Sequence, residues 1–560
     1  MKPVPGLPLA GAICRIPFEA AAGQIPAKET VGSKSHNLMR LAARGLPLPP
    51  AFVLGTEVCR DYLRRGETAL AGLPEILDRE LQHLAERTGR RFGDAKRPLL
   101  VSVRSGAALS MPGMMETVLN VGLNDATLRA LIRMTGNPRL GYDCRCRLVQ
   151  QYGEVVRAIA PVRFDLRRKS VLAELGACDV NELDTHGLAH MAKVFGDEFE
   201  AATGEPFPAD PHTQLKSAIE AVLRSWTSSR AQSYRELNGI SHELGTAATV
   251  QAMVFGNLGP ASGSGVGFTR NPADGRKALY VDYLPNAQGE DVVAGRRRTM
   301  GLAELERRAP EAYRALLEAR HALEDEFHDM QDFEFTVEEG RLYVLQARTG
   351  KRTPLAALRI AHDLVEEGLI SASEALARID ALDLEAIETV RLKPGADQTP
   401  FARGTSASAG VAIGAAVFDP ERVLQVKQGG RAVILIRENA ETSDIGALSE
   451  AAALVAAEGA RTSHAAVVAR ELGKVCVVGC EGLAIDPSGR TCVWRGETIE
   501  EGQTLSVDGD AGEIYHGEVE VVTDRPCELL AKMADWRAKE RSGVPPTAIP
   551  PVGLVRRVPM

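Results

Sequence analysis

Hydrophobic and polar residues are arranged along the chain in stretches that alternately predict strands and helices. Residues 30–123 alternate between the two, and the apolar run PLLVSVRSGA predicts a buried strand. From residue 124 to about residue 212 the pattern becomes helical, polar and rich in arginine, which indicates a helical insertion. Strand patterns then return in TAATVQAMVFGN, VGFTRNP and ALYVDYLP. The first half therefore predicts an α/β region that is interrupted by helices.

The pattern changes after a final helix and strand pair. AYRALLEARHALEDEFHDM predicts a helix, and a Glu-Gly turn joins the strands DFEFTVEEG and RLYVLQAR. After Arg348 an amphipathic helical segment leads into RLKPGADQTP, whose proline and glycine are typical of a linker. A second β-rich unit with two helical stretches runs from about Gly404 to Val521. A short helix and a proline-rich tail follow it.

These patterns predict an α/β multidomain protein of six parts. They are an N-terminal part at 1–123, a helical insertion at 124–212, a C-terminal part of the same region at 213–352, a helical linker at 353–400, a second β/α domain at 401–521, and the helix and tail at 522–560.

Composition narrows the class of protein. Apolar residues make up 44% and charged residues 25% of the chain, as in an ordinary soluble protein. A net charge of −8 and only 5% aromatic residues argue against a nucleic-acid partner. The N-terminus shows no secretory signal, no apolar run reaches membrane-spanning length, and nine cysteines have irregular spacing. We therefore expect a cytoplasmic protein with reduced thiols and no membrane partner.

Acidic residues alternate on one predicted strand. Asp332 and Glu334 lie two positions apart, so both carboxylates project from one face. Oxygen ligands of this kind suit Mg²⁺ that bridges nucleotide phosphates. Gln346 and Arg348 repeat the spacing on the next strand, and pairing of the two strands would bring all four side chains to one wall. A half-exposed strand has the same alternation, so the spacing alone leaves a solvated face open.

Three other segments contain residues that suit phosphate binding. ASGSGVGFTRNP supplies Gly263, Gly265 and Gly267, which would let backbone N–H groups approach a phosphate. VGSKSHN places Lys34 beside a Gly-Ser turn, and VSVRSG places Arg104 at a strand end. A hairpin turn and two surface cations are the simpler interpretation of the same residues.

A histidine precedes a predicted helix in EGARTSHAAVVARELGKVCVVG. Thr462 or Ser463 can cap that helix, which places His464 near its first turn. Exposed N–H groups and the positive end of the helix dipole would stabilise a phosphate on the imidazole there. Imidazole is also a nucleophile near neutral pH. This chemistry alone leaves a structural histidine open.

Taken together, these segments resemble the pyruvate phosphate dikinase and phosphoenolpyruvate synthase family, and the dikinase more closely. The similarity extends from about Thr30 to Val521. It implies an ATP-grasp nucleotide-binding region at 1–123 and 213–352, and a swivelling phosphohistidine domain at 401–521. The stretches that carry it include VGSKSHNLMRLAARGLPLPPAFVLGTEVC, LLVSVRSGAALSMPGMMETVLNVGLND, TVQAMVFGN, SGSGVGFTRNP, NAQGEDVVAG, MQDFEFTVEEGRLYVLQARTGKRT and TSHAAVVAR.

The resemblance implies a role for each matched residue. His464 would carry the phosphate, with Thr462 as its hydrogen-bonding neighbour. On the nucleotide side, Lys34 and Arg104 would bind phosphates, and a glycine loop at Gly263, Gly265 and Gly267 would cover them. The backbone from Gln251 to Val254 would meet the adenine, and Glu290 would lie in the nucleotide pocket. Asp332 and Glu334 would hold Mg²⁺, while Gln346 and Arg348 would contact the phosphates being cleaved.

The chain departs from the family pattern at two places. Ser33 and Ser35 stand where the family usually has glycines, and His36 is unusual beside them. Before Thr462, the dikinase typically has Gly-Gly-Met, whereas Ala460 and Arg461 stand here. Arg461 is more like the synthase and would add a phosphate contact.

The family reaction moves the β-phosphate of ATP to histidine and releases AMP. The γ-phosphate goes to inorganic phosphate in the dikinase and to water in the synthase. The closer resemblance of this sequence to the dikinase favours inorganic phosphate. Family enzymes continue into a (β/α)₈ barrel that binds pyruvate or phosphoenolpyruvate. Only about 40 residues follow Val521, whereas such a barrel needs roughly 250. We expect no such barrel, and an acceptor bound by a separate subunit or protein; a homodimer is also compatible.

Three other interpretations remain open. A self-contained small-molecule kinase would need an acceptor site between domains, although 353–400 is too short for the acceptor domain that rifampin phosphotransferases contain. A non-catalytic regulatory protein that binds nucleotide would not require Asp332, Glu334 and His464 to be intact. The third is a truncated dikinase. Since His464 must serve two sites, a swivel with hinges near Pro394–Pro400 and Val521–Pro526 is expected.

Overall fold

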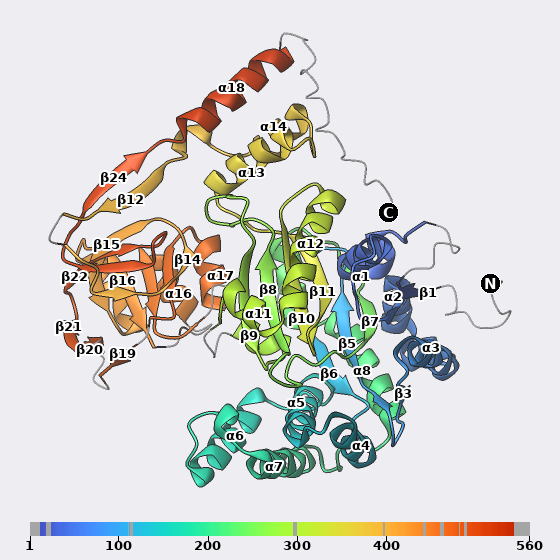
Figure 1. Ribbon diagram of the computed structural model, residues 1–560. Helices are drawn as coiled ribbons and strands as arrows, with labels where there is room; N and C mark the ends of the chain where they lie inside the picture. Colours follow the sequence, from blue (N-terminus) through green and yellow to red (C-terminus); the bar gives the residue numbers. More distant parts are fainter. Residues whose placement is uncertain are drawn as a thin grey trace. The chain divides into compact units, whose positions relative to one another are not determined.

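The computed structural model contains two compact units (Figure 1). The first unit comprises Met1–Leu258 and Tyr343–Ala347, and the second comprises Gly259–Leu342 and Arg348–Met560. We keep the finer predicted division, with boundaries at 123, 212, 352, 400 and 521, as a proposal. The residues described are 12–17, 24–109, 111, 116–294, 299–395, 398–438, 440, 444–459, 464–480, 482–486, 490–494 and 496–541.

The first unit is built on a five-stranded antiparallel sheet. Its order is β1 (Ile13–Ile16), β2 (Ala51–Leu54), β7 (Ala247–Ala252), β5 (Val101–Gly106) and β6 (Thr117–Val121). The predicted buried strand is confirmed as β5, and every residue of the central strand β7 is buried. The helices of this part are α1 (Lys28–Ala43), α2 (Thr56–Arg65) and α3 (Leu73–Thr88).

The arginine-rich segment is helical, as predicted, and the teal helices between residues 124 and about 204 lie together in Figure 1. Side chains mark where these helices begin: the side-chain Oδ1 of Asn124 accepts from Thr127 N–H, and the Asp184 carboxylate accepts from Gly187 N–H. Left-handed glycines such as Gly136 and Gly204 mark where they end. The helices are α4 (Asp125–Thr135), α5 (Pro138–Val156), α6 (Pro161–Leu175), α7 (Thr185–Thr203), α8 (Pro211–Ser225) and α9 (Ser229–Leu237).

A four-stranded sheet lies largely in the second unit, although Tyr343–Ala347 of one of its strands are counted with the first. Its order is β11 (Arg341–Thr349), β10 (Gln331–Glu338), β8 (Gly263–Phe268) and β9 (Tyr280–Pro285). The predicted Glu-Gly turn between β10 and β11 is confirmed, because Glu339 and Gly340 both have positive φ, as a tight hairpin turn requires. The associated helices are α10 (Gly289–Ala294), α11 (Leu302–Arg308) and α12 (Pro310–Phe327).

A helical module and a two-stranded ribbon follow this sheet (Figure 1). Helices α13 (Pro354–Glu366), α14 (Ala372–Ile379) and α18 (Cys527–Arg541) pack around the fully buried Met533. Strand β12 (Thr389–Lys393) pairs with β24 (Glu520–Asp524) in antiparallel register. Most of the segment Val521–Pro526 is paired in this ribbon, and its role as a hinge stays a prediction.

An eight-stranded mixed sheet forms the rest of the second unit. Four neighbouring strands, β15 to β18, run parallel, and the flanking strands are antiparallel. The strand order is β13 (Ala402–Arg403), β23 (Glu513–His516), β22 (Thr504–Asp508), β15 (Val411–Val417), β16 (Val433–Arg437), β17 (Ala453–Ala456), β18 (Val475–Val478) and β14 (Thr405–Ser408). The helices are α15 (Val423–Gln428), α16 (Ile445–Glu450) and α17 (His464–Glu471). A small sheet contains β19 (Leu483–Ile485), β20 (Thr491–Trp494) and β21 (Glu497–Glu500).

Two expected absences concern the described part of the chain only. None of its sheets is a (β/α)₈ barrel. None of its helices combines the length and the apolar character that crossing a membrane requires.

Candidate functional site

Asp332 and Glu334 lie on β10, as predicted, and alternate there with Phe333 and Phe335. The Arg348 Nε donates a hydrogen bond of 2.7 Å to Asp332 Oδ2. Burial raises the pKa of the Asp332 carboxyl, and the Arg348 guanidinium partly opposes this rise. The structure thus brings together Asp332, a predicted Mg²⁺ ligand, and Arg348, a predicted phosphate-binding residue. Gln346, two positions before Arg348 on β11, is half-buried.

The two carboxylates are a partial ligand set. In the described residues, no group of three or more His, Cys, Asp and Glu side chains could hold a metal ion. Mg²⁺ in nucleotide sites needs only one or two carboxylates, because phosphates and waters supply its other ligands. Asp332 and Glu334 therefore fit Mg²⁺ that arrives with a nucleotide, and do not form a protein cage for the ion alone.

The expectation of a glycine loop at Gly263, Gly265 and Gly267 is wrong, because all three lie within the fully buried strand β8. Gly265 and Gly267 are paired with Phe335 and Phe333, so their missing side chains would point to the aromatic face. A Cβ on Gly265 would lie 2.3 Å from Phe335 Cζ, and a Cβ on Gly267 would lie 2.6 Å from Phe333 Cζ. These glycines make room for aromatic rings on the face opposite Asp332 and Glu334.

Gly265→Ala is expected to lower the free energy of unfolding by about 1–3 kcal/mol, as overpacking does. The added Cβ would also lie 2.8 Å from the Asp282 carbonyl oxygen, which cannot rotate away. Differential scanning calorimetry measures the loss. Gly259→Ala is the matched control, since nothing lies within 4 Å of a Cβ there. Unchanged stability with weaker ATP binding would instead support a phosphate-binding role.

Lys34 and Arg104 both lie in the first unit. Lys34 is on α1, two residues after Gly32, whose φ of 79° interrupts the helix; the predicted turn is therefore a kink inside α1. A Cβ on Gly32 would lie 2.1 Å from the Gly106 carbonyl oxygen, so only glycine permits this approach. Ser33 N–H donates to the Ala107 carbonyl at 2.9 Å. These contacts join the segment of Lys34 to the end of β5, the strand that contains Arg104.

The unusual residues around Lys34 all have partners. The Ser33 hydroxyl donates to the Ala107 carbonyl at 3.1 Å, and the buried Ser35 hydroxyl lies 2.7 Å from Thr249 Oγ1. His36 Nδ1 lies 2.8 Å from the Pro26 carbonyl oxygen. Ser33, Ser35 and His36 are therefore accommodated by hydrogen bonds, two of which reach residues distant in the sequence.

The proposed adenine-binding segment begins inside the sheet. Gln251 is buried on β7, where it is paired with Ala51 and Ser102, and its amide donates to the Pro49 carbonyl at 3.2 Å. Val254 follows the end of that strand and is half-buried. Gln251 thus supports the sheet through its side chain.

In the second unit, Glu290 lies half-buried on α10.

The candidate carrier histidine begins a helix, as predicted. His464 is the first residue of α17, and its side chain is not among the parts that the structure describes. Thr462 lies outside the described residues. Helix α17 also contains Arg470, which sequence reasoning missed. Arginine in the last turn of a helix is common because it complements the dipole, so the sequence gives no distinguishing signal.

Comparisons with known families match two parts of the chain. Residues 67–302 match the family model described as pyruvate phosphate dikinase, AMP/ATP-binding domain, and residues 429–512 match the model described as PEP-utilising enzyme, mobile domain.

The chain contains an ATP-binding domain of the pyruvate phosphate dikinase type and a mobile domain of the PEP-utilising enzyme type.

Dikinase relatives extend this similarity over most of the chain. The pyruvate, phosphate dikinase of Clostridium symbiosum is 40% identical over 528 residues, which is 94% of this chain and 60% of the relative. The enzyme of Rhizobium meliloti (strain 1021) is 40% identical over 533 residues, covering 93% and 59%. The chloroplastic dikinase 1 of Oryza sativa subsp. japonica is 42% identical over 493 residues, covering 88% and 52%. The chain thus spans less than two thirds of each of these dikinases.

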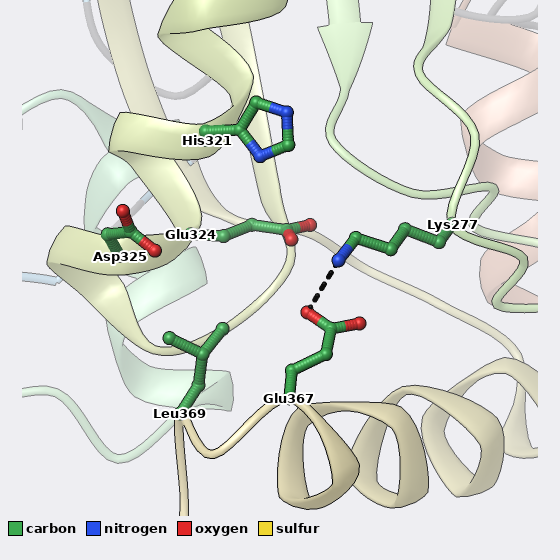
Figure 2. A pocket seen from close by; sticks show the side chains of 6 residues that line it. All are labelled: Lys277, His321, Glu324, Asp325, Glu367 and Leu369. Atoms are coloured by element: carbon green, nitrogen blue, oxygen red, sulfur yellow. Dashed lines mark ion pairs between the residues drawn. The ribbon is translucent and has the colours of Figure 1, made fainter. Parts of the chain in front are cut away.

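A cavity of about 300 Å³ in the second unit is separate from the residues expected of a dikinase site (Figure 2). Its lining is Lys277, His321, Glu324, Asp325, Glu367 and Leu369. The fully buried Arg270 bonds Glu324 at 3.0 and 2.9 Å and Glu367 at 2.8 Å. Lys277 Nζ lies 2.9 Å from Glu367. These paired charges connect α12, the residue that ends α13 and the segment after β8, which indicates a structural role.

Proposed function

We propose that this chain catalyses ATP-dependent phosphotransfer of the dikinase type, with His464 as the phosphate carrier. The observation that carries the proposal is the presence of an ATP-binding domain and a mobile domain in one chain, with Asp332 and Arg348 hydrogen-bonded on the carboxylate face. The part that matches the ATP-binding domain contains Arg104, Gln251, Val254 and Glu290. The part that matches the mobile domain contains Thr462 and His464.

The nucleotide contacts follow from the chemistry of these side chains. Lys34 and Arg104 neutralise phosphate charge, and Arg348 forms charge-assisted hydrogen bonds to the phosphates that are cleaved, with Gln346 beside it on the strand. Val254 supplies backbone contact to the adenine, supported by Gln251, and Glu290 lies in the pocket. Asp332 and Glu334 hold Mg²⁺, which when bound neutralises the charge that develops on the phosphates.

Transfer balances with His464 as nucleophile. An imidazole nitrogen forms a bond to the β-phosphorus, and the bond between that phosphorus and the oxygen bridging to the α-phosphate breaks. AMP keeps the α-phosphate and the bridging oxygen. The bond between the γ-phosphorus and the oxygen bridging to the β-phosphate then breaks, and that oxygen stays on the β-phosphorus. The γ-phosphoryl group goes to inorganic phosphate, giving pyrophosphate, or to water, giving phosphate. Thr462 stabilises the phosphorylated imidazole. We propose inorganic phosphate, because the sequence is closer to the dikinase than to the synthase.

The acceptor is the second part of the proposal. A separate subunit or protein that binds the acceptor is the arrangement we propose to test. A longer single chain is the competing arrangement, since the relatives extend well beyond the matched part. A self-contained small-molecule kinase and a non-catalytic regulator remain alternatives with no specific observation in their favour.

Product analysis with the 560-residue chain tests both parts of the proposal. With ATP and Mg²⁺, we expect AMP and phosphohistidine to form together, and pyrophosphate to appear only when inorganic phosphate is added. Adding pyruvate to this chain alone is expected to yield no phosphoenolpyruvate. ADP without AMP would support an ordinary kinase, and absence of phosphohistidine under every phosphate condition would contradict the carrier role. Phosphoenolpyruvate formation would contradict a separate acceptor.

A further inference from the structure

Three residues form a row across the second unit's four-stranded sheet. Asp332 on β10 is directly opposite Phe268 on β8, and Phe268 is directly opposite Tyr280 on β9. Directly opposite residues project from the same face, so the three side chains lie side by side. The rings of Phe268 and Tyr280 meet edge to face at 6.2 Å. The row thus connects the candidate metal ligand to two aromatic side chains.

The mobile domain contacts this row through its edge strand β14. The Tyr280 hydroxyl donates a hydrogen bond of 2.9 Å to the Ser406 carbonyl. Strand β14 is the last strand of its sheet, and its register with β18 shifts between Ser406 and Ser408, so Ala407 is the extra residue of a bulge. An edge strand with a bulge presents carbonyl groups away from its own sheet. Tyr280 binds one of these carbonyls.

Arg470 binds the next carbonyl and reaches the same row. Its Nη2 and Nε donate to the Ala407 carbonyl at 2.7 and 3.2 Å. Its guanidinium carbon lies 5.8 Å from the centroid of the Phe268 ring, within the range of a cation–π contact. Its positive charge also contributes to lowering the pKa of Asp332, against the larger effect of burial. Arg470 belongs to α17, the helix that begins at His464.

We infer that Arg470, together with the Ser406 carbonyl and Tyr280, forms the docking contact that holds the mobile domain at the ATP-binding domain while His464 receives its phosphate. Arg470 is a positioning residue: it touches Phe268 and the Ala407 carbonyl. Because Arg470 and His464 belong to one helix, fixing the end of α17 restricts where its first residue lies. The role of this contact in phosphate transfer rests on the proposed function. The contact between Tyr280, Arg470 and their partners is independent of that function.

Rapid-quench measurements of phosphohistidine formation test the role of Arg470. At saturating ATP, Arg470→Gln is expected to slow formation about tenfold, because the cation–π contact that joins the mobile domain to Phe268 of β8 is lost. ATP affinity is expected to stay within about twofold, since the lost contacts do not involve bound nucleotide. Arg470→Lys is expected to recover part of the rate, because it keeps the charge above Phe268. Tyr280→Phe, which removes only the hydroxyl, is expected to cost about two- to fivefold.

Two control variants separate docking from stability of the mobile domain. Arg437 also donates to a backbone carbonyl of that domain, Phe418 at 3.2 Å, and Tyr515 donates to Glu513 at 2.7 Å. Arg437→Gln and Tyr515→Phe are expected to keep the normal rate. Equal slowing in the controls, or unchanged rates in Arg470→Gln, would overturn the inference.

Hydrogen exchange tests the contact without any chemistry. Without ATP, Tyr280→Phe is expected to speed exchange of backbone amides in β14, because the domain leaves its docked position more often. Unchanged exchange would overturn the docking contact. If the unaltered protein forms no phosphohistidine, the proposed function fails, and the exchange result still decides whether the contact exists.

Discussion

His464→Ala is expected to abolish phosphorylation of the protein by ATP labelled at the β-phosphate. The reason is that alanine supplies no nucleophile, and α17 (HAAVVARE) contains no second histidine that could replace His464. Label on the unaltered protein is expected to be lost in acid and kept in alkali, as a phosphorus–nitrogen bond requires. The measurement is label retained after denaturation under each condition, followed by mass spectrometry of the labelled peptide.

The matched control is His190→Ala. His190 is a half-exposed histidine on α7 that lies 3.3 Å from Glu174, and no step of the proposed transfer involves it. We expect it to label like the unaltered protein. ATP binding is expected to survive in His464→Ala, because that residue belongs to the mobile domain. Full labelling of His464→Ala would show that another residue is the carrier.

The carboxylate strand shows how far the sequence could be interpreted. Alternating acidic and aromatic residues predicted β10, and the Glu-Gly pair predicted its hairpin, because a strand repeats every two residues and a tight turn needs positive φ. The same local reasoning predicted the insertion helices, which begin at Asn or Asp side chains and end at glycines. These features are decided within a few residues, and a sequence pattern records them directly.

The glycines of β8 show where that reasoning stops. Gly265 has a packing purpose that depends on Phe335, its partner across the sheet and 70 positions later in the chain. The sequence of β8 alone cannot distinguish a glycine that admits a phosphate from one that admits an aromatic ring. Arg470 is a similar case, since its partner is a carbonyl exposed by a bulge at Ala407, 63 residues earlier. Long-range pairing decides both, and no local period encodes it.

Asp332→Asn is expected to slow phosphohistidine formation about 10³-fold, the effect of losing several kcal/mol of metal-assisted charge stabilisation. Asparagine keeps the size of the side chain and removes its charge, so the proposed Mg²⁺ ligand and the ion pair with Arg348 are lost together. The fold is expected to tolerate the change, because burial already disfavours the charged carboxylate and raises its pKa. Thermal unfolding measured beside the quench experiment checks that expectation.

Magnesium dependence separates a ligand role from a structural one. If Asp332 holds Mg²⁺, raising the Mg²⁺ concentration is expected to restore part of the rate in Asp332→Asn, because Glu334 on the same face of β10 is retained. Glu338→Gln, also on that face but at the far end of the strand, is expected to leave both rate and Mg²⁺ dependence unchanged. A slow variant with unaltered Mg²⁺ dependence would assign Asp332 to orienting Arg348 instead.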